Sequence, residues 1–492
     1  MKLKTLLQPI VGCRAAFNEN PEITSVETDS RTVTDGSLFV CIKGYSADRH
    51  DYIDQAVDAG AAAVVADHPV TASVPVAVVP NTNRAASLLI DTFYDHPTSK
   101  LHLIGVTGTN GKTTTTHLIE NMFVRAGQKT GLIGTIGMTF DRRPLGLKAE
   151  APTTPDAVTL QKGFATMVDK GADTAIMEVS SHALDMGRVH GCDFNIAVFT
   201  NLSQDHLEYH KTMDDYFRAK SLLFSQLGNT YSKNPLKLAV INGDDERAPE
   251  LYKATAVQFL VYGITCKDAD VRAENVVLTE KGTTFTLCTP YGDVPVHLPL
   301  VGMFNVYNAL AAASAALFSG LSLDTIKASL ENERGVPGRF ELVEEGQSYA
   351  VIVDYAHTPD SLENVLKTAK AFASGRIIVV VGCGGDRDPS KRPLMARIAV
   401  KYGDMAVFTS DNPRTEDPQA ILKDMERGVK DNSYVSIVNR KEAIEYAIRQ
   451  ASGKDLVLIA GKGHETYQII GEDVIDFDDR EVAREAIKGK RG

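Results

Sequence analysis

An apolar strand, a glycine-rich loop and a helix follow one another in the segment LHLIGVTGTNGKTTTTHLIENMFVRAG, residues 101–127. The unbroken apolar run is typical of a strand buried on both faces of a parallel sheet. Glycines let the loop backbone approach a ligand closely and the helix N-terminus adds positive potential, so the segment predicts a phosphate-binding loop. Lys112 would reach the terminal phosphates and Thr113 would meet Mg²⁺, although Val106 stands where the common motif has its first glycine. The predicted loop residues are Gly108, Thr109, Asn110, Gly111, Lys112, Thr113 and Thr114.

Two polar segments divide the chain, which at 492 residues is too long for one hydrophobic core. DHPTSK at 95–100 and ENERGVPGR at 331–339 predict domain boundaries. We expect a small N-terminal α/β domain at 1–98 and a central domain with a P-loop-type, mostly parallel sheet at 99–335. The regular alternation of strands and helices in the last third predicts a C-terminal domain at 336–492 with a doubly wound, Rossmann-like sheet.

Four polar segments follow predicted strands of the C-terminal domain. They are DYAHTPD from 354, GCGGDRD from 382, SDNPRTED from 410 and GKGHETY from 461. Because ligands bind beyond the carboxyl ends of the strands in such sheets, we expect these segments to line one edge. In the central domain, by contrast, residues 268–301 alternate apolar and polar side chains and predict antiparallel strands.

The composition argues against several classes of protein. A net charge of −11 disfavours nucleic acid as the main partner, because phosphate backbones are bound by basic surfaces. No apolar run approaches the roughly 20 residues of a membrane helix, and the N-terminal apolar stretch is too short for a signal peptide. The six cysteines are far apart and include no CxxC pair, which disfavours a zinc or redox motif. We therefore expect a monomeric, cytoplasmic protein with reduced thiols.

A series of longer motifs occurs along the whole chain. They are DSR at 29–31, GTNGKT at 108–113, TTP at 153–155, EVSSH at 178–182, NLSQDHLEYH at 201–210, AKS at 219–221, GRFE at 338–341, DYAHTPDSL at 354–362 and GKGHE at 461–465. With these motifs the sequence resembles the Mur ligase family, the ATP-dependent amide-forming enzymes of peptidoglycan precursor synthesis. The resemblance implies that ATP phosphorylates a substrate carboxylate, and that an amine then displaces phosphate from the acyl phosphate.

Glu178 ends one predicted strand of the central domain and His206 follows the next, so both face the phosphate loop if the strand order follows the chain order. A carboxylate in that place can hold Mg²⁺ against ATP. The resemblance implies two Mg²⁺ ions with Thr113, Glu178, His206 and Lys220 as ligands. The implied catalytic residues are Lys112, Glu178, His206 and Lys220. It also implies that Lys220 reacts with CO₂ to form an anionic carbamate. Without the resemblance, Lys220 would be a surface residue of an amphipathic helix.

The resemblance assigns further residues to the two nucleotide substrates. Asn305 is implied as the adenine contact, while Arg339 and Asp354 close onto ATP from the third domain, with His357 as a further contributor. The implied contacts to the UDP-sugar are Ser30, Tyr45, Ser46 and Ala47, and those to the muramoyl-dipeptide are Thr153, Thr154, Ser180 and Arg188. Without the resemblance, Ser30 would belong to a capped turn. Met186 stands where the family has a glutamine, so we assign no substrate contact to that position.

Arg414 follows a predicted strand in the motif DNPR, where a turn requires no arginine. The resemblance implies that DNPR marks the members that add meso-2,6-diaminopimelate, which has a distal carboxylate that L-lysine lacks. Arg414 is therefore predicted to bind that carboxylate; the alternative is an ion pair with Glu416 or Asp417. The predicted amino-acid site comprises Arg387, Asp411, Asn412, Pro413, Arg414, Gly461 and Glu465.

The expected reaction adds meso-diaminopimelate to the D-glutamate γ-carboxylate of UDP-N-acetylmuramoyl-L-alanyl-D-glutamate. Two alternatives remain open. The same ligation could use L-lysine or another diamino acid. The chain could instead be a nucleotide-binding switch whose P-loop does not serve ligation.

Overall fold

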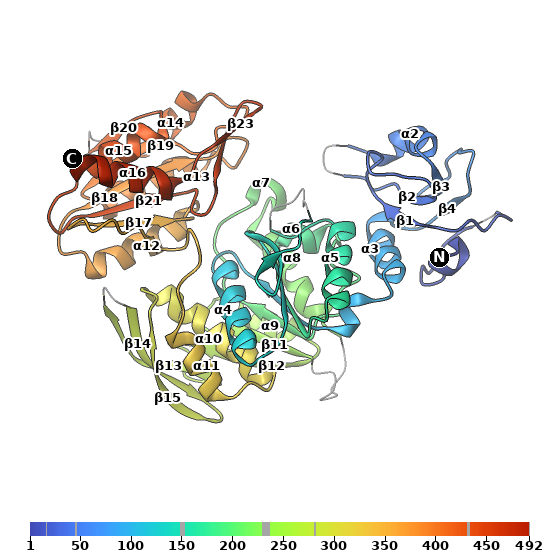
Figure 1. Cartoon of the computed structure of the whole chain (residues 1–492), viewed down its shortest axis with the longest axis horizontal. Coiled ribbons are helices and arrows are strands. Elements are labelled where there is room, and N and C mark those ends of the chain that lie inside the picture. The colour runs from blue at the N-terminus through green and yellow to red at the C-terminus, as the bar shows by residue number, and fades with distance from the viewer. Residues whose placement is uncertain are drawn as a thin grey trace.

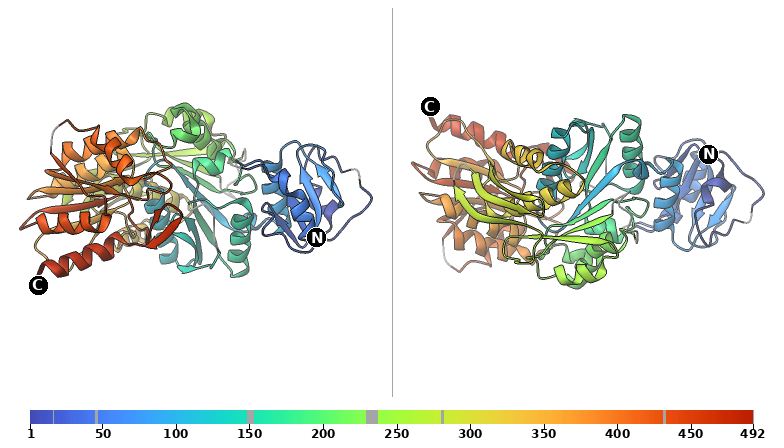
Figure 2. Two further views of the ribbon diagram at one scale, coloured as in Figure 1. Left: turned by 90° about the horizontal axis from the view of Figure 1, so that it is seen from above. Right: turned by 90° about the horizontal axis from the view of Figure 1, so that it is seen from below.

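Three large sheets follow one another along the chain. The computed structural model describes residues 1–15, 17–44, 47–147, 153–228, 237–279, 282–430 and 433–491. Each sheet is covered by helices, and the three α/β units lie in chain order, with the N-terminal unit at one end of the molecule (Figure 1). Two further views show the N-terminal unit beside the central unit alone (Figure 2). The predicted three-domain α/β fold is confirmed.

The N-terminal sheet has four parallel strands in the order β1-β2-β3-β4. Its elements are α1 (Leu3–Leu7), β1 (Ser25–Glu27), β2 (Ser37–Val40), η1 (Arg49–Tyr52), α2 (Ile53–Asp58), β3 (Ala61–Ala66), β4 (Val76–Val78) and α3 (Thr82–Phe93). α3 covers the sheet with Leu89 and Ile90. It also reaches the central unit, where Ser87 Oγ donates a hydrogen bond to Gly187 O at 2.6 Å.

The central sheet has eleven strands in the order β15-β14-β13-β12-β11-β10-β5-β9-β6-β7-β8. The strands are β5 (His102–Thr107), β6 (Thr130–Gly134), β7 (Gly137–Phe140), β8 (Arg143–Pro144), β9 (Thr174–Glu178), β10 (Ile196–Phe199), β11 (Leu238–Asn242), β12 (Gln258–Gly263), β13 (Val271–Thr279), β14 (Gly282–Thr289) and β15 (Gly292–Leu298). β5 pairs in parallel with both β9 and β10, so the strands before Glu178 and His206 flank the phosphate-loop strand and not each other. The predicted antiparallel segment is confirmed by β13, β14 and β15.

Helices cover both faces of the central sheet. One face packs against α4 (Lys112–Arg125), α10 (Met303–Phe318) and α11 (Leu323–Glu331); the other packs against α5 (Ala157–Asp169), α8 (Met213–Ser225) and α9 (Ala248–Ala254). The shorter elements are η2 (Pro97–Lys100), α6 (Ser181–Asp185) and α7 (Leu207–His210). α4 begins directly after Gly111, whose φ of 84° turns the chain out of the strand direction and favours glycine. The predicted loop therefore connects β5 to α4.

The C-terminal sheet has the order β16-β17-β21-β18-β19-β20, parallel except for β16. Its elements are β16 (Glu341–Leu342), β17 (Ala350–Asp354), α12 (Pro359–Phe372), β18 (Ile377–Cys383), α13 (Lys391–Tyr402), β19 (Met405–Ser410), α14 (Pro418–Glu426), β20 (Tyr434–Ser436), α15 (Arg440–Gln450), β21 (Leu456–Ala460) and α16 (Asp479–Arg491). α12 to α14 cover one face and α15 and α16 cover the other, as a doubly wound sheet requires. A separate hairpin, β22 (Tyr467–Ile470) and β23 (Asp473–Asp476), was not predicted. Every helix in the described part of the chain is too short or too polar to span a membrane.

A fully buried ion pair fixes two strand ends of this sheet. Arg440 binds both carboxylate oxygens of Asp479, at 2.7 and 2.8 Å. The same guanidinium donates to Ser410 O at 3.2 Å and to Ala460 O at 3.0 Å. Because these two carbonyls end β19 and β21, the pair holds the edge that continues into the predicted amino-acid site. Removing one partner of such a pair typically costs about 3–5 kcal/mol of stability.

Candidate functional site

A cavity of about 1200 Å³ lies between the central and C-terminal units. The loops after β5, β6, β9 and β10 form its central wall, and those after β17, β18, β19 and β21 form its C-terminal wall, as expected for parallel sheets. The lining includes the following predicted residues: Thr109, Asn110, Gly111, Lys112, Thr113, Thr114, Thr153, Glu178, His206, Arg339, Asp354, His357, Arg387, Asp411, Asn412, Arg414, Gly461 and Glu465. Most of the ATP, metal and amino-acid predictions thus converge on one space.

Other predicted residues do not line this cavity. Those in the same two units are Gly108, Thr154, Ser180, Arg188, Lys220, Asn305 and Pro413. Ser30 and Ala47 belong to the N-terminal unit, and Tyr45 and Ser46 lie outside the described residues. Ser30 Oγ donates to Gln55 Oε1 at 3.1 Å. Asn305 is buried at the start of α10, where its amide donates to Val301 O at 3.0 Å.

The phosphate loop is tightly packed from behind. A Cβ on Gly108 would lie 1.9 Å from Thr200 Oγ1, and one on Gly111 would lie 2.3 Å from Asn308 Oδ1, so only glycine fits at either position. Lys112 is folded back on the loop, with Nζ donating to Gly108 O at 2.9 Å and to Thr109 O at 2.8 Å. Burial lowers the pKa of Lys112, although the nearby Glu178 carboxylate opposes this shift. The lysine therefore ties two carbonyls of its own loop together.

Glu178 is a buried carboxylate that only neutral groups contact. It accepts hydrogen bonds from Thr135 N at 2.8 Å, from Thr135 Oγ1 at 3.0 Å and from Thr113 Oγ1 at 3.1 Å. Among the described residues no cation forms an ion pair with it. Thr135 was not predicted, yet it directly follows β6 at the same sheet edge, so the strand-end rule that identified Glu178 would have found it.

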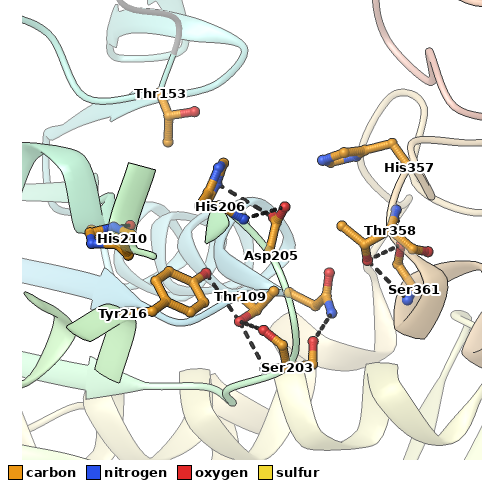
Figure 3. Close-up of polar contacts among 12 residues, drawn as sticks. Thr109, Thr153, Ser203, Asp205, His206, His210, Tyr216, His357, Thr358 and Ser361 are labelled. Carbon is orange, nitrogen blue, oxygen red and sulfur yellow. Dashed lines mark hydrogen bonds and ion pairs between the residues drawn. The ribbon is translucent and has the colours of Figure 1, made fainter. Parts of the chain in front are cut away.

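His206 and the adjacent Asp205 lie on the other side of the loop. His206 has φ 55° and its ring faces two carboxylates, with Nε2 3.4 Å from Asp205 and Nδ1 3.5 Å from Glu208. Burial alone would raise the pKa of Asp205, but the charges of His206, His357 and Lys391 lower it to about 2. His357, from the C-terminal unit, points across the cavity toward this pair (Figure 3). Imidazole and carboxylate groups from two units therefore meet above the phosphate loop.

Lys220 is buried, with a relative exposure of 1%, so its interpretation as a surface lysine is wrong. Its Nζ donates to Gly108 O at 2.8 Å and lies 4.4 Å from the centroid of the Tyr216 ring. The same carbonyl also accepts a hydrogen bond from Lys112. Burial, reinforced by the charge of Lys112, lowers the pKa of Lys220 well below its usual value. Two amino groups therefore share one carbonyl, and Lys220 has no carboxylate within ion-pair distance among the described residues.

Two direct contacts join the C-terminal unit to the phosphate loop. Arg339 Nη2 donates to Thr113 Oγ1 at 2.9 Å, and Asn110 Nδ2 donates to Asp360 Oδ2 at 2.8 Å. The Arg339 guanidinium carbon lies 4.6 Å from the centroid of the Tyr355 ring, and its buried Nε has no partner among the described residues. Burial raises the pKa of Asp354 to about 6, against the opposing charge of Arg339. Hydrogen bonds thus connect the central and C-terminal walls of the cavity directly.

Arg414 forms no ion pair among the described residues, so the ion-pair alternative for this residue is wrong. Glu416 instead pairs with Arg392 at 2.8 Å, and Asp417 caps α14 by accepting a hydrogen bond from the backbone amide of Gln419. The Arg414 guanidinium donates only to carbonyls, those of Gly385 at 2.8 Å and Asn412 at 3.4 Å.

Arg387 lines the same part of the cavity and donates to Asp386 O at 2.9 Å. Both side chains lie against Gly384, where a Cβ would be 2.9 Å from Arg414 Nη1 and 3.8 Å from Arg387 Cγ. Burial and then the charge of Arg414 lower the pKa of Arg387. Neither has a carboxylate partner among the described residues. Two guanidinium groups without an ion-pair partner therefore lie in this part of the cavity.

The hairpin β22–β23 holds the backbone at residue 414. Arg414 has φ 53°, which is uncommon for a residue other than glycine. Its amide donates to Ile469 O at 3.1 Å, and its carbonyl accepts from Gly471 N at 2.7 Å. The amide of Ile469 donates in turn to Asn412 Oδ1 at 3.0 Å. The Asn412 side chain therefore connects the loop after β19 to the hairpin, a role that its position in the motif did not predict.

Acidic groups lie beside the two arginines. Glu465 accepts from Lys462 Nζ at 2.8 Å and from Asn412 Nδ2 at 2.9 Å. Burial and the neighbouring Asp411 raise the pKa of Glu465. Burial would also raise the pKa of Asp411, but the charges of Lys462 and Arg440 lower it. A ligand with both an ammonium and a carboxylate group fits between these acids and the arginines.

The residues predicted for the muramoyl-dipeptide form one network behind Glu178. Thr154 Oγ1 donates to Glu178 O and accepts from Ser180 N, both at 2.9 Å. Arg188 donates to Thr154 O at 3.1 Å and contacts Met186 Sδ at 3.3 Å. Burial lowers the pKa of Arg188. The structure thus brings three of these predicted residues together next to Thr153, which lines the cavity.

Three family descriptions match successive parts of the chain. "Mur ligase family, catalytic domain" matches residues 22–94, "Mur ligase middle domain" matches 106–316 and "Mur ligase, glutamate ligase domain" matches 338–463.

Curated relatives match over the full length. The UDP-N-acetylmuramoyl-L-alanyl-D-glutamate–2,6-diaminopimelate ligase of Bacillus cereus is 58% identical over 490 residues, which cover 100% of this chain and 99% of that protein. The protein of the same name from Listeria monocytogenes is 49% identical over 493 residues, which cover 100% of both chains.

Solved structures are similar as well. A structure of UDP-N-acetylmuramoyl-L-alanyl-D-glutamate–2,6-diaminopimelate ligase has a TM-score of 0.67 and 36% identity over 96% of each chain. The MurF ligase from Thermotoga maritima in complex with ADP has a TM-score of 0.62 and 18% identity, covering 95% of this chain and 96% of that one, which shows a shared fold.

Proposed function

The chain belongs to the Mur ligase family, and on that premise we propose that it adds meso-2,6-diaminopimelate to the D-glutamate γ-carboxylate of UDP-N-acetylmuramoyl-L-alanyl-D-glutamate. The observation that carries the proposal is the placement of Arg387 and Arg414. Both line the same cavity as the phosphate loop, and neither has a carboxylate partner among the described residues.

ATP is the phosphoryl donor, and Mg²⁺ fits the central wall. A buried carboxylate contacted only by neutral donors is costly, and a cation would compensate Glu178. The Thr113 hydroxyl would add an oxygen ligand beside Glu178, and the His206 ring, on the other side of the loop, would serve a second ion. When bound, Mg²⁺ would neutralise charge on the phosphates.

The protein's own groups position the phosphoryl transfer. Lys112 would exchange the carbonyls of Gly108 and Thr109 for the terminal phosphates. Arg339 would donate from the opposite wall, where its guanidinium lines the cavity and already contacts Thr113 of the loop. The γ-carboxylate of D-glutamate attacks the γ-phosphorus and ADP leaves. The amine of diaminopimelate then attacks the acyl carbon, phosphate leaves with the bonding electron pair, and the nitrogen loses a proton to give the amide.

Lys220 is assigned the carbamate. Its amine would add to the carbon of CO₂ and lose one proton, giving an anion in place of a potential cation. Its burial and its shared carbonyl with Lys112 support this assignment, because a second ammonium at Gly108 O would repel the first. The carbamate oxygens would add anionic ligands for a second Mg²⁺ near His206.

The three domains divide the work. We assign uridine diphosphate to the N-terminal domain, residues 1–98, with Ser30 and the segment 45–47. The dipeptide would extend toward the cavity past Arg188 and Thr153, in the central domain of residues 99–335. The domain of residues 336–492 would contribute Arg339, Asp354 and the amino-acid site, so that no single domain holds all three substrates.

An amino-acid panel tests the proposal. The protein is incubated with ATP, Mg²⁺, the UDP-dipeptide and one candidate amino acid, and the product is identified by mass spectrometry. We expect the diaminopimelate adduct and no L-lysine adduct. An L-lysine product would overturn the assigned amino acid, and phosphate release that does not require the UDP-dipeptide would indicate a nucleotide switch instead of a ligase.

A further inference from the structure

Two histidines and two aspartates gather on the N-terminal unit, away from the cavity. Asp67 and His68 directly follow β3, while Asp48 and His50 lie at the start of η1. His50 Nε2 lies 3.3 Å from Asp67 Oδ1, and His68 Nδ1 lies 2.6 Å from the same oxygen. The two imidazole centroids are 4.5 Å apart. Donor atoms of His50, Asp67 and His68 all lie within 4.8 Å of one another.

A fourth residue fixes the orientation of His50. Its Nδ1 lies 2.5 Å from Asp48 Oδ1, and the backbone amide of His50 donates to the same oxygen at 3.1 Å. With the Nδ1 proton held by Asp48, the Nε2 lone pair points at Asp67, whose backbone amide donates a long hydrogen bond to it at 3.5 Å. Metal-binding histidines commonly have such an outer carboxylate, which sets the tautomer and the ring orientation. The Asp67 carboxylate oxygen also lies 3.3 Å from this nitrogen, and a cation shared by the two atoms would relieve the repulsion that the long amide hydrogen bond only partly offsets.

We propose that His50, Asp67 and His68 bind a divalent transition-metal ion of the Zn²⁺, Co²⁺ or Ni²⁺ type. Imidazole nitrogens select these ions, whereas Mg²⁺ and Ca²⁺ prefer sites made only of oxygen. Metal–ligand distances of about 2.0–2.2 Å place ligand atoms up to roughly 4 Å apart around one ion, so small side-chain rotations suffice. The His50 side chain is 8% exposed and the His68 side chain 57%, which gives one fixed ligand and one adjustable ligand.

The ion would join the end of β3 to η1. Asp48 also forms an isolated bridge with Lys43, and Gly44 N donates to Ala47 O at 2.9 Å, so the loop before η1 begins next to the site. A bound ion would therefore fix the end of β3 against η1 and raise the free energy of unfolding of the N-terminal unit. The proposal does not rest on the chemistry of the cavity, since none of its residues lines the cavity.

Zinc binding to the full chain tests the site. Excess Mg²⁺ is kept present, and the bound Zn²⁺ is counted by equilibrium dialysis while the affinity is measured by calorimetry. The cavity offers a second group of candidate donors, His182, His206 and Glu208, so a difference between variants is needed. We expect the wild type to bind one Zn²⁺ more than His68→Ala, and His206→Ala to keep that ion. Asp48→Asn should weaken binding about 10–100-fold, as loss of an outer carboxylate does.

A matched control is available in the same unit. His96 pairs with Asp91 at 2.7 Å but is not part of either group of candidate donors among the described residues. His96→Asn should bind as much Zn²⁺ as the wild type, and asparagine tolerates the φ of 51° at this position. The melting temperature should rise with Zn²⁺ in His206→Ala but not when His68→Ala is added to it. Equal Zn²⁺ stoichiometry in wild type and His68→Ala would overturn the proposal and leave ordinary histidine–aspartate pairs.

Discussion

The two walls of the cavity are built alike, from loops at the carboxyl ends of parallel strands, but they hold different charges. Within the described part of the chain, the central wall has a carboxylate, Glu178, that only neutral groups contact, and a lysine, Lys112, that donates to carbonyls. In the same described residues, Arg387 and Arg414 of the C-terminal wall donate only to carbonyls. The first arrangement suits a cation and a polyphosphate, and the second suits a carboxylate.

Other arginines of the C-terminal unit form ion pairs, and comparing them with Arg387 and Arg414 separates structural charges from charges left for a ligand. Arg440 binds Asp479, and Arg392 binds both Glu416 and Asp424; both arginines are buried away from solvent. The charges of these two guanidinium groups are paired within the unit, where they hold strands and helices together. Arg414, by contrast, lines the cavity without an ion-pair partner among the described residues, so its charge can bind a carboxylate of a ligand. A charge with an internal partner thus serves the fold, and a charge without one marks a site.

The largest effect is expected for Lys112→Ala. We expect kcat to fall about 10³-fold, since loss of one preorganised donor costs about 10²–10³-fold and this donor is charged. The fold should persist, because the ammonium contacts only two carbonyls of its own loop. Steady-state kinetics and thermal unfolding measure the two quantities. Lys100→Ala, which removes a surface ion pair with Asp95, is the control and should leave kcat unchanged. Normal turnover by a folded Lys112→Ala protein would remove the phosphate-loop assignment.

Lys220→Ala should lower kcat about 10²-fold, with partial recovery in formate or acetate. A small carboxylate can occupy the space of the missing side chain and replace the anionic end of the carbamate. Rates measured against formate concentration test this, with chloride at equal ionic strength as the control. If chloride restores the rate equally well, or if the variant is nearly fully active without additive, Lys220 does not act as an anion.

Arg414→Ala should raise the KM for diaminopimelate about 30-fold. Charge-assisted contacts cost about 2–5 kcal/mol when one partner is removed, and the low end applies because Arg414 is only half-buried. The KM for ATP should change little. Arg414→Lys should recover poorly, since an ammonium cannot reproduce a two-pronged contact. Arg427→Ala removes the same charge from the surface of the same unit and should leave all constants unchanged. An unchanged diaminopimelate KM in Arg414→Ala would show that the carboxylate binds elsewhere.

The smallest effect is expected for Asp360→Ala, which removes the hydrogen bond to Asn110 that joins the walls. A partly exposed bond of this kind contributes about 1 kcal/mol, so we expect about a five-fold rise in the KM for ATP. Asp360→Asn keeps an acceptor, so its KM for ATP should lie between those of the wild type and Asp360→Ala. The unfolding temperature is the check on the fold, since Asp360 is also in the first turn of α12. A KM equal to that of the wild type would mean that the walls meet without this contact.

The sequence was sufficient to predict the strand ends and the residues on them. Glu178, Arg414 and the phosphate loop could be placed because parallel strands present their carboxyl ends at one edge, whatever the order of the strands. The order itself was not predictable, and β9 and β10 lie on either side of β5. Periodicity also could not show that Lys220 is buried, because the burial arises from packing of α8 beneath the loop.

Side-chain partners were the least predictable part of the site. Asn412 belongs to the motif that we assign to the amino-acid site, yet its amide is occupied by Lys462, Glu465 and the hairpin. Asn305 has a similar internal role at the start of α10. In both cases the contact depends on a segment distant in sequence or on helix geometry, and a short motif contains neither.

The hairpin β22–β23 fixes where residue 414 lies, whichever side chain that residue has. Ile469 and Gly471 hold the backbone of this residue on both sides through main-chain groups alone. A different side chain at 414 would therefore be presented to the same place in the cavity, at the cost of the same uncommon φ. Selectivity for the incoming amino acid can therefore change by substitution at position 414 alone. The backbone contacts with the hairpin would still place the new side chain at the same point of the cavity.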